Sequence, residues 1–221
     1  MRESYRAILK NEDWRKRLAK VHTQAHSSLP RRERRWRELD SCNSSDALLM
    51  NIFCHPATLR DRGVFDLLGL QLGSIPEFGL RARVPFANGR VDRTEVDMRL
   101  GDLLLEAKLT ESDFQCREVA MVEAYRDFED VFDAEALPRW EGQYLSYQLI
   151  RNVLAAYAGC DSFCVIADER RPDLREAWYA IMRCVRSAEL RVRCKMITWQ
   201  ELTLALPRSL QKFLEEKYGI S

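Results

Sequence analysis

Residues 94–110 read TEVDMRLGDLLLEAKLT and contain two strand-like segments separated by a turn at 101–102. Side chains alternate between the two faces of a β-strand, so every second residue shares a face. Glu106 and Lys108 therefore lie on the same face of the second segment, opposite an apolar row. The short turn folds the segments against each other and can bring Asp97 of the first segment close to Glu106. We expect two carboxylates and one ammonium group to converge at this hairpin.

The residues before this hairpin predict one more strand and a helix. The segment RARVPF (81–86) alternates like a strand, and the Asn-Gly pair of ANGR (87–90) is typical of a tight turn. Together with 94–110, it predicts a three-stranded antiparallel meander. Further upstream, GSIPEFG (73–79) predicts a loop, and SSDALLMNIF (44–53) predicts an apolar helix with a serine N-cap.

The residues after the hairpin alternate between helix and strand patterns. Residues 115–135 predict an acidic helix, and EGQYLSYQLIRNVLAAYA (141–158) predicts a strongly amphipathic helix that ends at Gly159. SFCVIAD (162–168) predicts a buried strand and VRCKMITW (192–199) predicts a last strand, with helices between and after them. The order of helix, three strands, helix and strand predicts an α/β fold with a mixed central sheet flanked by helices.

Two carboxylates and an amine on one side of a sheet have a clear chemical use. Carboxylate oxygens bind Mg²⁺, which usually keeps several waters and accepts phosphate oxygens. A bound divalent metal polarises a phosphate and lowers the pKa of a coordinated water. Lys108 would orient or deprotonate that water, or stabilise charge at the phosphorus centre. Taken alone, the pattern of Asp97, Glu106 and Lys108 is also typical of a half-exposed strand with a salt bridge.

The spacing of these residues resembles the PD-(D/E)XK superfamily of restriction-enzyme-like nucleases. That superfamily places an acid at the end of one strand and an acid-x-Lys sequence on the next. The corresponding residues here are Asp97, followed by Glu106-Ala107-Lys108. The resemblance implies an αβββαβ core and metal contacts from Asp97, Glu106 and the backbone carbonyl of Ala107. The first acid often follows proline in the superfamily, whereas Val96 precedes it here.

A second motif resembles the branch of this superfamily that is related to the nuclease domain of RecB. That branch carries Gln-x-x-x-Tyr on the helix after the active strand. Gln143 and Tyr147 match the motif, 35 residues after Lys108, and would face the same way on one helix. The resemblance implies that Gln143 binds the substrate backbone or a metal-bound water and that Tyr147 supports it. Arg151, one turn further along, would meet a phosphate or pair with the acidic helix.

The resemblance covers about residues 44–200 and implies a Mg²⁺- or Mn²⁺-dependent endonuclease that hydrolyses phosphodiester bonds in DNA. The alternative is a catalytically silent nucleic-acid-binding module on the same fold. An intact set of Asp97, Glu106 and Lys108 favours the enzyme, because a degenerate member would be expected to lose one of them. A third alternative is a regulatory interaction protein that docks through acidic residues 118–135. The sequence leaves open whether two subunits form a homodimer to cut both strands.

Residues 1–40 predict a basic helical N-terminal extension to a nuclease-like domain over 41–221. The extension holds 12 Lys and Arg against 6 Asp and Glu, whereas the rest of the chain holds 23 against 28. Residues 3–26 predict a charged helix, and the segment after it gathers arginines around an indole. Such groups clamp phosphates and stack on bases, which makes these residues candidate DNA contacts: Arg31, Arg32, Arg34, Arg35 and Trp36. A solvated helix followed by a charged linker explains the same charge pattern.

Composition and motifs argue against several other classes. No run approaches eighteen apolar residues, so we expect no membrane span. The charged N-terminus lacks the apolar stretch of a secretory signal, and we expect a cytoplasmic protein. The seven cysteines form no CxxC pair, so we expect buried free thiols instead of disulfides or a zinc site. The sequence contains no HExxH, GxSxG, GxGxxG or Walker A pattern.

Overall fold

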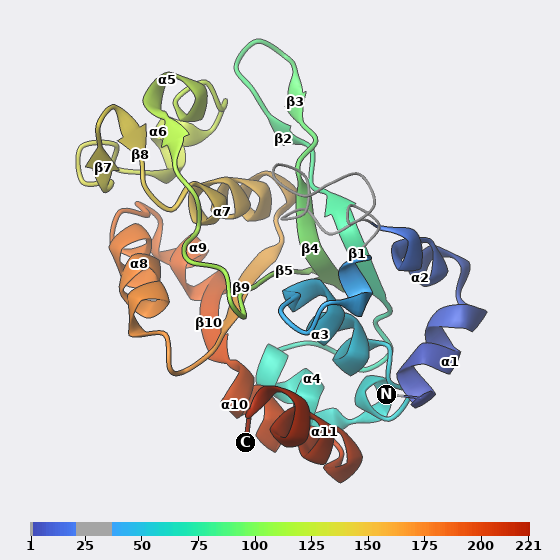
Figure 1. The fold of residues 1–221 in the computed structure, drawn as a ribbon. Helices are drawn as coiled ribbons and strands as arrows, with labels where there is room; N and C mark the ends of the chain where they lie inside the picture. The colour runs from blue at the N-terminus through green and yellow to red at the C-terminus, as the bar shows by residue number, and fades with distance from the viewer. Residues whose placement is uncertain (1, 21–36) are drawn as a thin grey trace, which may run out of the picture.

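A five-stranded mixed sheet forms the centre of the computed structural model, which describes residues 2–20 and 37–221 (Figure 1). The strand order is β1-β4-β5-β9-β10. The first three pair antiparallel, whereas β5, β9 and β10 are parallel. The bounds are β1 (Pro76–Arg81), β4 (Glu95–Leu100), β5 (Leu103–Ala107), β9 (Ser162–Ala167) and β10 (Cys194–Thr198). The predicted α/β class with a mixed central sheet is therefore confirmed.

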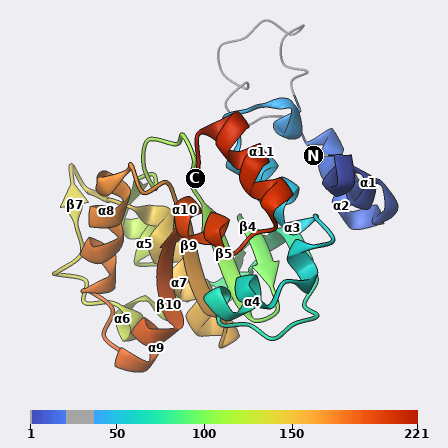
Figure 2. The same cartoon turned by 90° about the horizontal axis from the view of Figure 1, so that it is seen from below.

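Helices cover both faces of this sheet (Figure 2). One face packs on α3 (Ser45–Phe53), α4 (Arg62–Leu68), α10 (Trp199–Leu204) and α11 (Arg208–Tyr218). The other face packs on α7 (Tyr147–Gly159), α8 (Pro172–Met182) and α9 (Ala188–Arg193). Alternation along β5 divides its apolar side chains between the two layers, with Leu103 and Leu105 in one cluster and Leu104 in the other. The strand that ends in Glu106 and Ala107 is thus buried on both faces.

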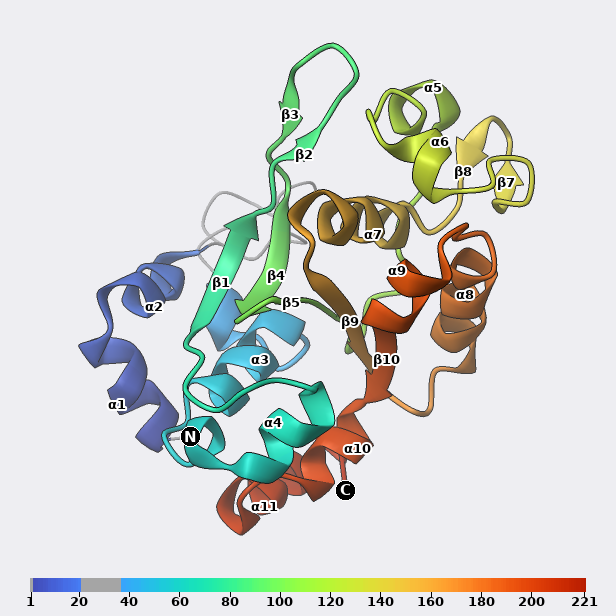
Figure 3. The same cartoon turned by 180° about the vertical axis from the view of Figure 1, so that it is seen from behind.

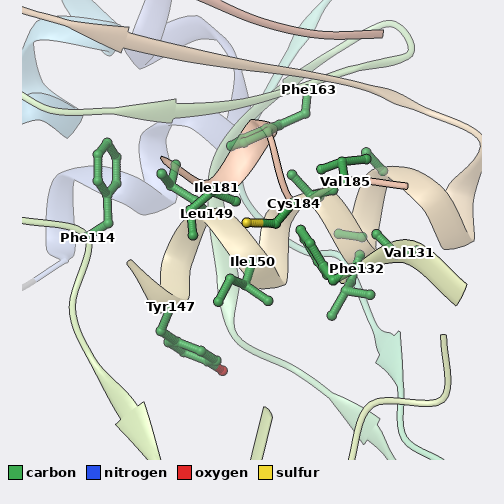
Figure 4. Close-up of a cluster of buried hydrophobic side chains, with 14 of the residues drawn as sticks. Phe114, Val131, Phe132, Tyr147, Leu149, Ile150, Phe163, Ile181, Cys184 and Val185 are labelled. Atoms are coloured by element: carbon green, nitrogen blue, oxygen red, sulfur yellow. The ribbon is translucent and has the colours of Figure 1, made fainter. Parts of the chain in front are cut away.

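The larger cluster fixes α7 against the sheet (Figure 4). Leu149 and Ile150 of α7 are fully buried, as are Phe163 of β9 and Ile181 of α8. Burying a large apolar side chain stabilises a fold by about 1.5–3 kcal/mol. This packing holds the helix that faces the end of β5 in one position.

The first strand of the meander begins earlier than predicted. β1 starts at Pro76 and pairs with β4, so the predicted loop over 73–79 is confirmed for residues 73–75 and wrong from Pro76 onward. Arg81 is the last residue of β1, and the rest of the predicted strand contributes β2 (Val84–Pro85), which pairs with β3 (Val91–Asp92) in a hairpin of its own. This hairpin projects from the sheet beyond β1 and β4 (Figure 3). The Asn-Gly turn therefore closes a separate hairpin and does not join two strands of the central sheet.

The prediction of an acidic helix over 115–135 is also wrong. Two single-turn helices and short strands occupy the region before α7. They are β6 (Arg117–Glu118), α5 (Val119–Val122), α6 (Phe128–Val131), β7 (Arg139–Trp140) and β8 (Gln143–Tyr144). α7 begins at Tyr147 and not at 141, because Glu141, Gly142 and Ser146 adopt positive φ angles that a right-handed helix does not allow. The predicted end of the helix at Gly159 is confirmed.

The N-terminal segment packs on the sheet and α3. It forms α1 (Arg2–Lys10), α2 (Glu12–Lys16) and a 3₁₀ turn (Arg17–Ala19), whereas one continuous helix was predicted. Two further 3₁₀ turns lie later in the chain, at Glu38–Asp40 and Thr58–Arg60. Asn11 caps α2 and so divides the helix. The indole of Trp14 donates a hydrogen bond to the Pro76 carbonyl at 2.8 Å. The predicted DNA contacts at 31–36 lie outside the described residues, and the division into 1–40 and 41–221 stays a prediction.

A glycine lets one basic side chain of this segment cross β1. Gly79 has a φ of +65°, and a Cβ at this position would overlap the guanidinium of Arg17. Arg17 passes over the glycine and pairs with Glu95 on β4 at 3.2 Å. The N-terminal segment thereby reaches the strand that carries Asp97.

All seven cysteines are free, as predicted, and Cys54, Cys164 and Cys184 are buried. Cys42, Cys116 and Cys160 are exposed, so the prediction of buried thiols holds for only part of the set. Among the described residues, no helix combines the length and the apolar character needed to cross a bilayer.

Candidate active site

Asp97 lies where β4 and β5 end their pairing. The register pairs Met98 with Leu105 and, continued by one residue, sets Asp97 opposite Glu106. The backbone N–H of Ala107 donates a hydrogen bond to Asp97 Oδ2 at 2.8 Å. The carboxylate thus takes the position of a backbone partner at the end of the ladder, next to the acid-x-Lys segment.

Glu106 is the most deeply buried acid of the predicted set, with 2% of its surface exposed. Its Oε1 lies 3.1 Å from Lys108 Nζ. Its Oε2 accepts a hydrogen bond from the side-chain amide of Asn152 at 2.9 Å. A buried carboxylate requires a countercharge and hydrogen bonds, and these two partners supply them. The predicted pair of Glu106 and Lys108 is therefore in direct contact.

Lys108 follows β5 and is fixed through both its backbone and its side chain. Its N–H donates to the Ile166 carbonyl at 2.8 Å, and its carbonyl accepts the indole N–H of Trp199 at 2.8 Å. Its Nζ also donates to Gln148 Oε1 at 2.7 Å and lies 5.4 Å from the ring centroid of Phe114. Lys108 has 4% of its surface exposed, and its ammonium group has a defined set of partners.

Helix α7 supplies two side chains that the sequence motifs did not predict. Gln148 binds Lys108 and Asn152 binds Glu106, and the two residues are four apart on α7, so they share a helix face. Asn152 has no exposed surface and, together with Arg151, interrupts the apolar stretch from Leu149 to Ala156. A buried amide within the apolar face of a predicted helix is the signal that could have identified it.

The predicted Gln143–Tyr147 pair is not on one helix face, which corrects the motif assignment. Gln143 is exposed in the short strand β8, where it pairs with Glu118 and Trp140. Tyr147 is the first residue of α7, and its hydroxyl lies 2.8 Å from that of Tyr125. The left-handed conformation of residue 146 separates the two motif positions, so neither contacts the acid-x-Lys segment.

Arg151 is buried beneath the site, with 3% of its surface exposed. Its guanidinium donates to the Asn152 side-chain oxygen at 2.8 Å and to the Glu95 carbonyl at 3.1 Å. Because Asn152 in turn binds Glu106, Arg151 positions the amide that holds the buried acid. Its contact with a phosphate stays a prediction.

The N-terminal end of α3 brings further charges to this region. Asp46 is 7% exposed and pairs with Arg17 at 2.8 Å and with Lys20 at 2.5 Å. Ser45 Oγ donates to Glu111 Oε1 at 2.7 Å, which ties α3 to the loop that follows Lys108. Two basic side chains of the N-terminal segment therefore cover the acid of α3.

Burial and neighbouring charges change the ionisation of the site. Burial, the charge of Glu106 and the charge of Asp46 raise the pKa of Asp97 well above its ordinary value. Burial lowers the pKa of Lys108, but the charges of Glu106 and Asp97 outweigh it, and the pKa is raised overall. The lysine is therefore an ammonium at neutral pH. In this state it can donate hydrogen bonds to water or phosphate but cannot accept a proton.

The donor atoms at the end of β5 suit a hard divalent cation. Asp97 and Glu106 supply the carboxylate oxygens that Mg²⁺ and Mn²⁺ prefer. In a strand, the N–H and C=O of one residue point to the same neighbour, so the Ala107 carbonyl faces the side where its N–H meets Asp97. Within residues 2–20 and 37–221, no three His, Cys, Asp or Glu side chains are grouped to hold a metal. A cation here would take two side chains and one carbonyl, with water completing its shell.

We expect Asp97→Asn to stabilise the metal-free protein at pH 7 by about 0.5–2 kcal/mol. Below its ordinary pKa near 3.8, the carboxyl is protonated in both the folded and unfolded chain. As the pH rises, the unfolded chain loses this proton first, so the free energy of unfolding falls until the folded carboxyl has ionised. Asparagine removes this loss and can still accept the Ala107 hydrogen bond.

Urea unfolding in EDTA at pH 3 and pH 7 measures the difference. Asp102→Asn, at the exposed turn between the same strands, is the matched control and should change neither value. A destabilised Asp97→Asn variant at pH 7 would contradict the assigned direction.

The comparison with protein families supplies a match over almost the whole chain. The family model described as Restriction Endonuclease associating with ARP, REase-ARP, matches residues 1–219. Comparisons with curated proteins and with solved structures give no match. The family match confirms the restriction-endonuclease-like family at the coarse level, while the RecB-like branch is not confirmed. The chain therefore belongs to the restriction endonuclease family REase-ARP.

Proposed function

We propose that this protein is a divalent-metal-dependent endonuclease that hydrolyses phosphodiester bonds in DNA. Membership of a restriction endonuclease family supports a nuclease. The observation that carries the proposal is the meeting of Asp97, Glu106 and Lys108 where the pairing between β4 and β5 stops, at the end of β5. The order of α3, then β1, β4 and β5, then α7 and β9 supports the αβββαβ core that the PD-(D/E)XK resemblance implies.

Asp97, Glu106 and the Ala107 carbonyl would hold Mg²⁺ or Mn²⁺. The metal, when bound, polarises the phosphate and lowers the pKa of a coordinated water. Lys108 is an ammonium that donates hydrogen bonds, so it orients the attacking water or stabilises negative charge on the phosphate oxygens. In the metal-free protein the charges of Glu106 and Asp97 raise the pKa of Lys108, so in that state it donates hydrogen bonds and does not act as a base.

Two amides of α7 keep these groups in place during the reaction. Gln148 holds the ammonium from its amide oxygen, and Asn152 holds Glu106 from its amide N–H. Both bonds come from one face of α7, on which Asn152 is buried and Gln148 half-buried, so the lysine and the acid are positioned as a unit. Such positioning lowers the cost of arranging reactants in the transition state.

The direct test is incubation of the full chain with supercoiled plasmid in Mg²⁺, Mn²⁺ or EDTA. We expect nicked and linear products with either metal and none in EDTA. Single-stranded DNA and RNA in parallel reactions identify the preferred nucleic acid. Cleavage that persists in EDTA would contradict a metal-dependent reaction, and no cleavage of any substrate with either metal would contradict a nuclease.

A catalytically silent nucleic-acid-binding module is the second candidate function. The observation that favours it is that both carboxylate oxygens of Glu106 already have protein partners, Lys108 and Asn152. A metal would have to share or displace these contacts. Tight DNA binding without cleavage under every metal condition would support the module.

The partners follow the same proposal. DNA is the substrate that the family description supports, and its wording also names an association with ARP. We propose that association for this chain, and co-purification of the full chain with ARP tests it. Sedimentation of the full chain shows whether it forms the homodimer that would cut both strands.

A further inference from the structure

A cavity of about 310 Å³ lies between the β2–β3 hairpin and the segment that carries β6 and α5. Both units project on the same side of the molecule, beyond α7 (Figures 1 and 3), and Tyr147 at the start of α7 lines the cavity between them. Backbone hydrogen bonds join them, from Ala87 N–H to the Ala124 carbonyl at 2.9 Å and from Arg126 N–H to the Pro85 carbonyl at 3.0 Å. The volume is at the small end of ligand pockets, so it suits a single ring system.

A saturated polar network forms one wall of this cavity. Asp92 Oδ1 accepts hydrogen bonds from the N–H and hydroxyl of Thr94 at 2.7 and 2.5 Å. Its Oδ2 lies 2.5 Å from the Tyr125 hydroxyl and 3.2 Å from that of Tyr147. Three acceptor positions of the carboxylate are used by Thr94 and Tyr125, and the Tyr147 hydroxyl lies against the fourth. The network therefore fixes two aromatic rings and leaves no acceptor on Asp92 to read the edge of a base.

The remaining wall combines an aromatic platform with positive charge. Phe86 is half-buried and stacks on buried Tyr125, with ring centroids 4.6 Å apart and an interplanar angle of 10°. Arg93 and Arg117 line the same cavity and are exposed. Arg117 lies 5.5 Å from the ring centroid of Tyr147. Within residues 2–20 and 37–221, neither guanidinium forms an ion pair, so both are available to an anion.

Two residues that line the cavity lie close in sequence to residues of the candidate active site. Thr94 precedes Asp97 by three residues, about 10 Å along an extended chain. Tyr147 directly precedes Gln148, which holds Lys108. A strand of nucleic acid with its phosphate at Asp97 and Glu106 would carry a neighbouring nucleotide to this cavity.

We propose that the cavity binds one unstacked nucleotide of the substrate strand, with its base against Phe86 and its phosphate between Arg93 and Arg117. Aromatic rings stack on any base, and guanidinium groups bind phosphate oxygens in pairs. Because Asp92 has no free acceptor, the cavity takes the four bases with similar affinity. The assignment rests on the proposed nuclease function and adds the requirement for a base that has left the duplex stack.

Binding without cleavage tests this assignment. In EDTA, the affinity of the full chain for a labelled single-stranded oligonucleotide is measured by fluorescence anisotropy. Phe86→Ala and Arg117→Ala should each weaken binding about tenfold. Tyr179→Ala and Arg175→Ala are matched controls, because both residues are exposed on α8 and should bind as the wild type does. Photo-crosslinking of 5-iododeoxyuridine strands should label the peptide that contains Phe86.

The outcomes separate the cavity from the nuclease. Wild-type affinity in both Phe86→Ala and Arg117→Ala, with plasmid cleavage intact, overturns the cavity assignment and leaves the nuclease standing. A wild-type chain that neither binds nor cleaves nucleic acid overturns both. Free nucleoside monophosphate that protects the cavity from crosslinking, in a chain that does not bind strands, would assign it to a free nucleotide and overturn the strand proposal. Melting curves identify any variant that has failed to fold.

Discussion

Asp97→Ala and Lys108→Ala should each cut supercoiled plasmid at least ~10³-fold more slowly than the wild type. Asp97→Ala would remove a metal ligand, and a divalent metal supplies several kcal/mol of transition-state stabilisation. Lys108→Ala would remove the only ammonium in contact with Glu106 among the described residues. A loss of about 4 kcal/mol corresponds to a thousandfold change in rate. Single-turnover cleavage at saturating enzyme measures this change in isolation from binding.

Matched controls separate loss of chemistry from loss of structure. Asp102→Ala removes an exposed acid from the turn between the same strands, and Lys212→Ala removes an exposed lysine from α11. Both should cut at the wild-type rate. DNA affinity in EDTA should change less than the rate in Asp97→Ala. Cleavage that survives both Asp97→Ala and Lys108→Ala would locate the chemistry elsewhere in the chain.

The alternation of residues 94–110 was enough to predict the meeting of Asp97, Glu106 and Lys108. A two-residue period and a tight turn are local properties, so they do not depend on how the rest of the chain folds. The observed register sets Asp97 opposite Glu106 as expected. The apolar positions of β5 divide between two cores, so the strand is buried on both faces, whereas the sequence predicted only one apolar face.

The partners of this trio come from elements that local patterns describe poorly. The amphipathic pattern of the sequence extends back to residue 141, but the helix cannot, because residues 141, 142 and 146 adopt positive φ angles. Because α7 starts at Tyr147, the side chains that contact the end of β5 are Gln148 and Asn152, and not the predicted Gln143 and Tyr147. Of the two motif residues, only Tyr147 lies on α7, whereas Gln143 lies in β8 before the helix, and their roles at the site stay predictions.

Pairing between distant segments explains the other errors. β1 pairs with β4 across the β2–β3 hairpin, and no local pattern indicates which of two nearby segments joins the sheet. The contact of Arg17 with Asp46 joins residues 29 apart and depends on the glycine at position 79. Such contacts follow from the assembled fold, so single-sequence periodicity does not contain them.

Trp199→Ala should lower the free energy of unfolding by about 3–5 kcal/mol, the largest stability effect that we expect near the site. The ring is 1% exposed and packs in the cluster beneath α10 and α11. Its indole N–H also holds the Lys108 carbonyl at 2.8 Å. Truncation leaves a cavity and an unsatisfied buried carbonyl, and both contributions are destabilising. Urea unfolding followed by circular dichroism measures the change.

Trp199→Phe separates the hydrogen bond from the packing. Phenylalanine retains most of the apolar contacts but cannot donate to Lys108, so we expect about 1–3 kcal/mol of lost stability and a slower cleavage step with DNA affinity unchanged. Trp178→Phe is the matched control, because Trp178 is 4% exposed and packs on Phe163 in the other cluster. It should lose stability without losing rate. If Trp199→Phe cuts as fast as the wild type, the indole supports only the core, and the position of Lys108 is fixed by its bonds to Ile166, Glu106 and Gln148 alone.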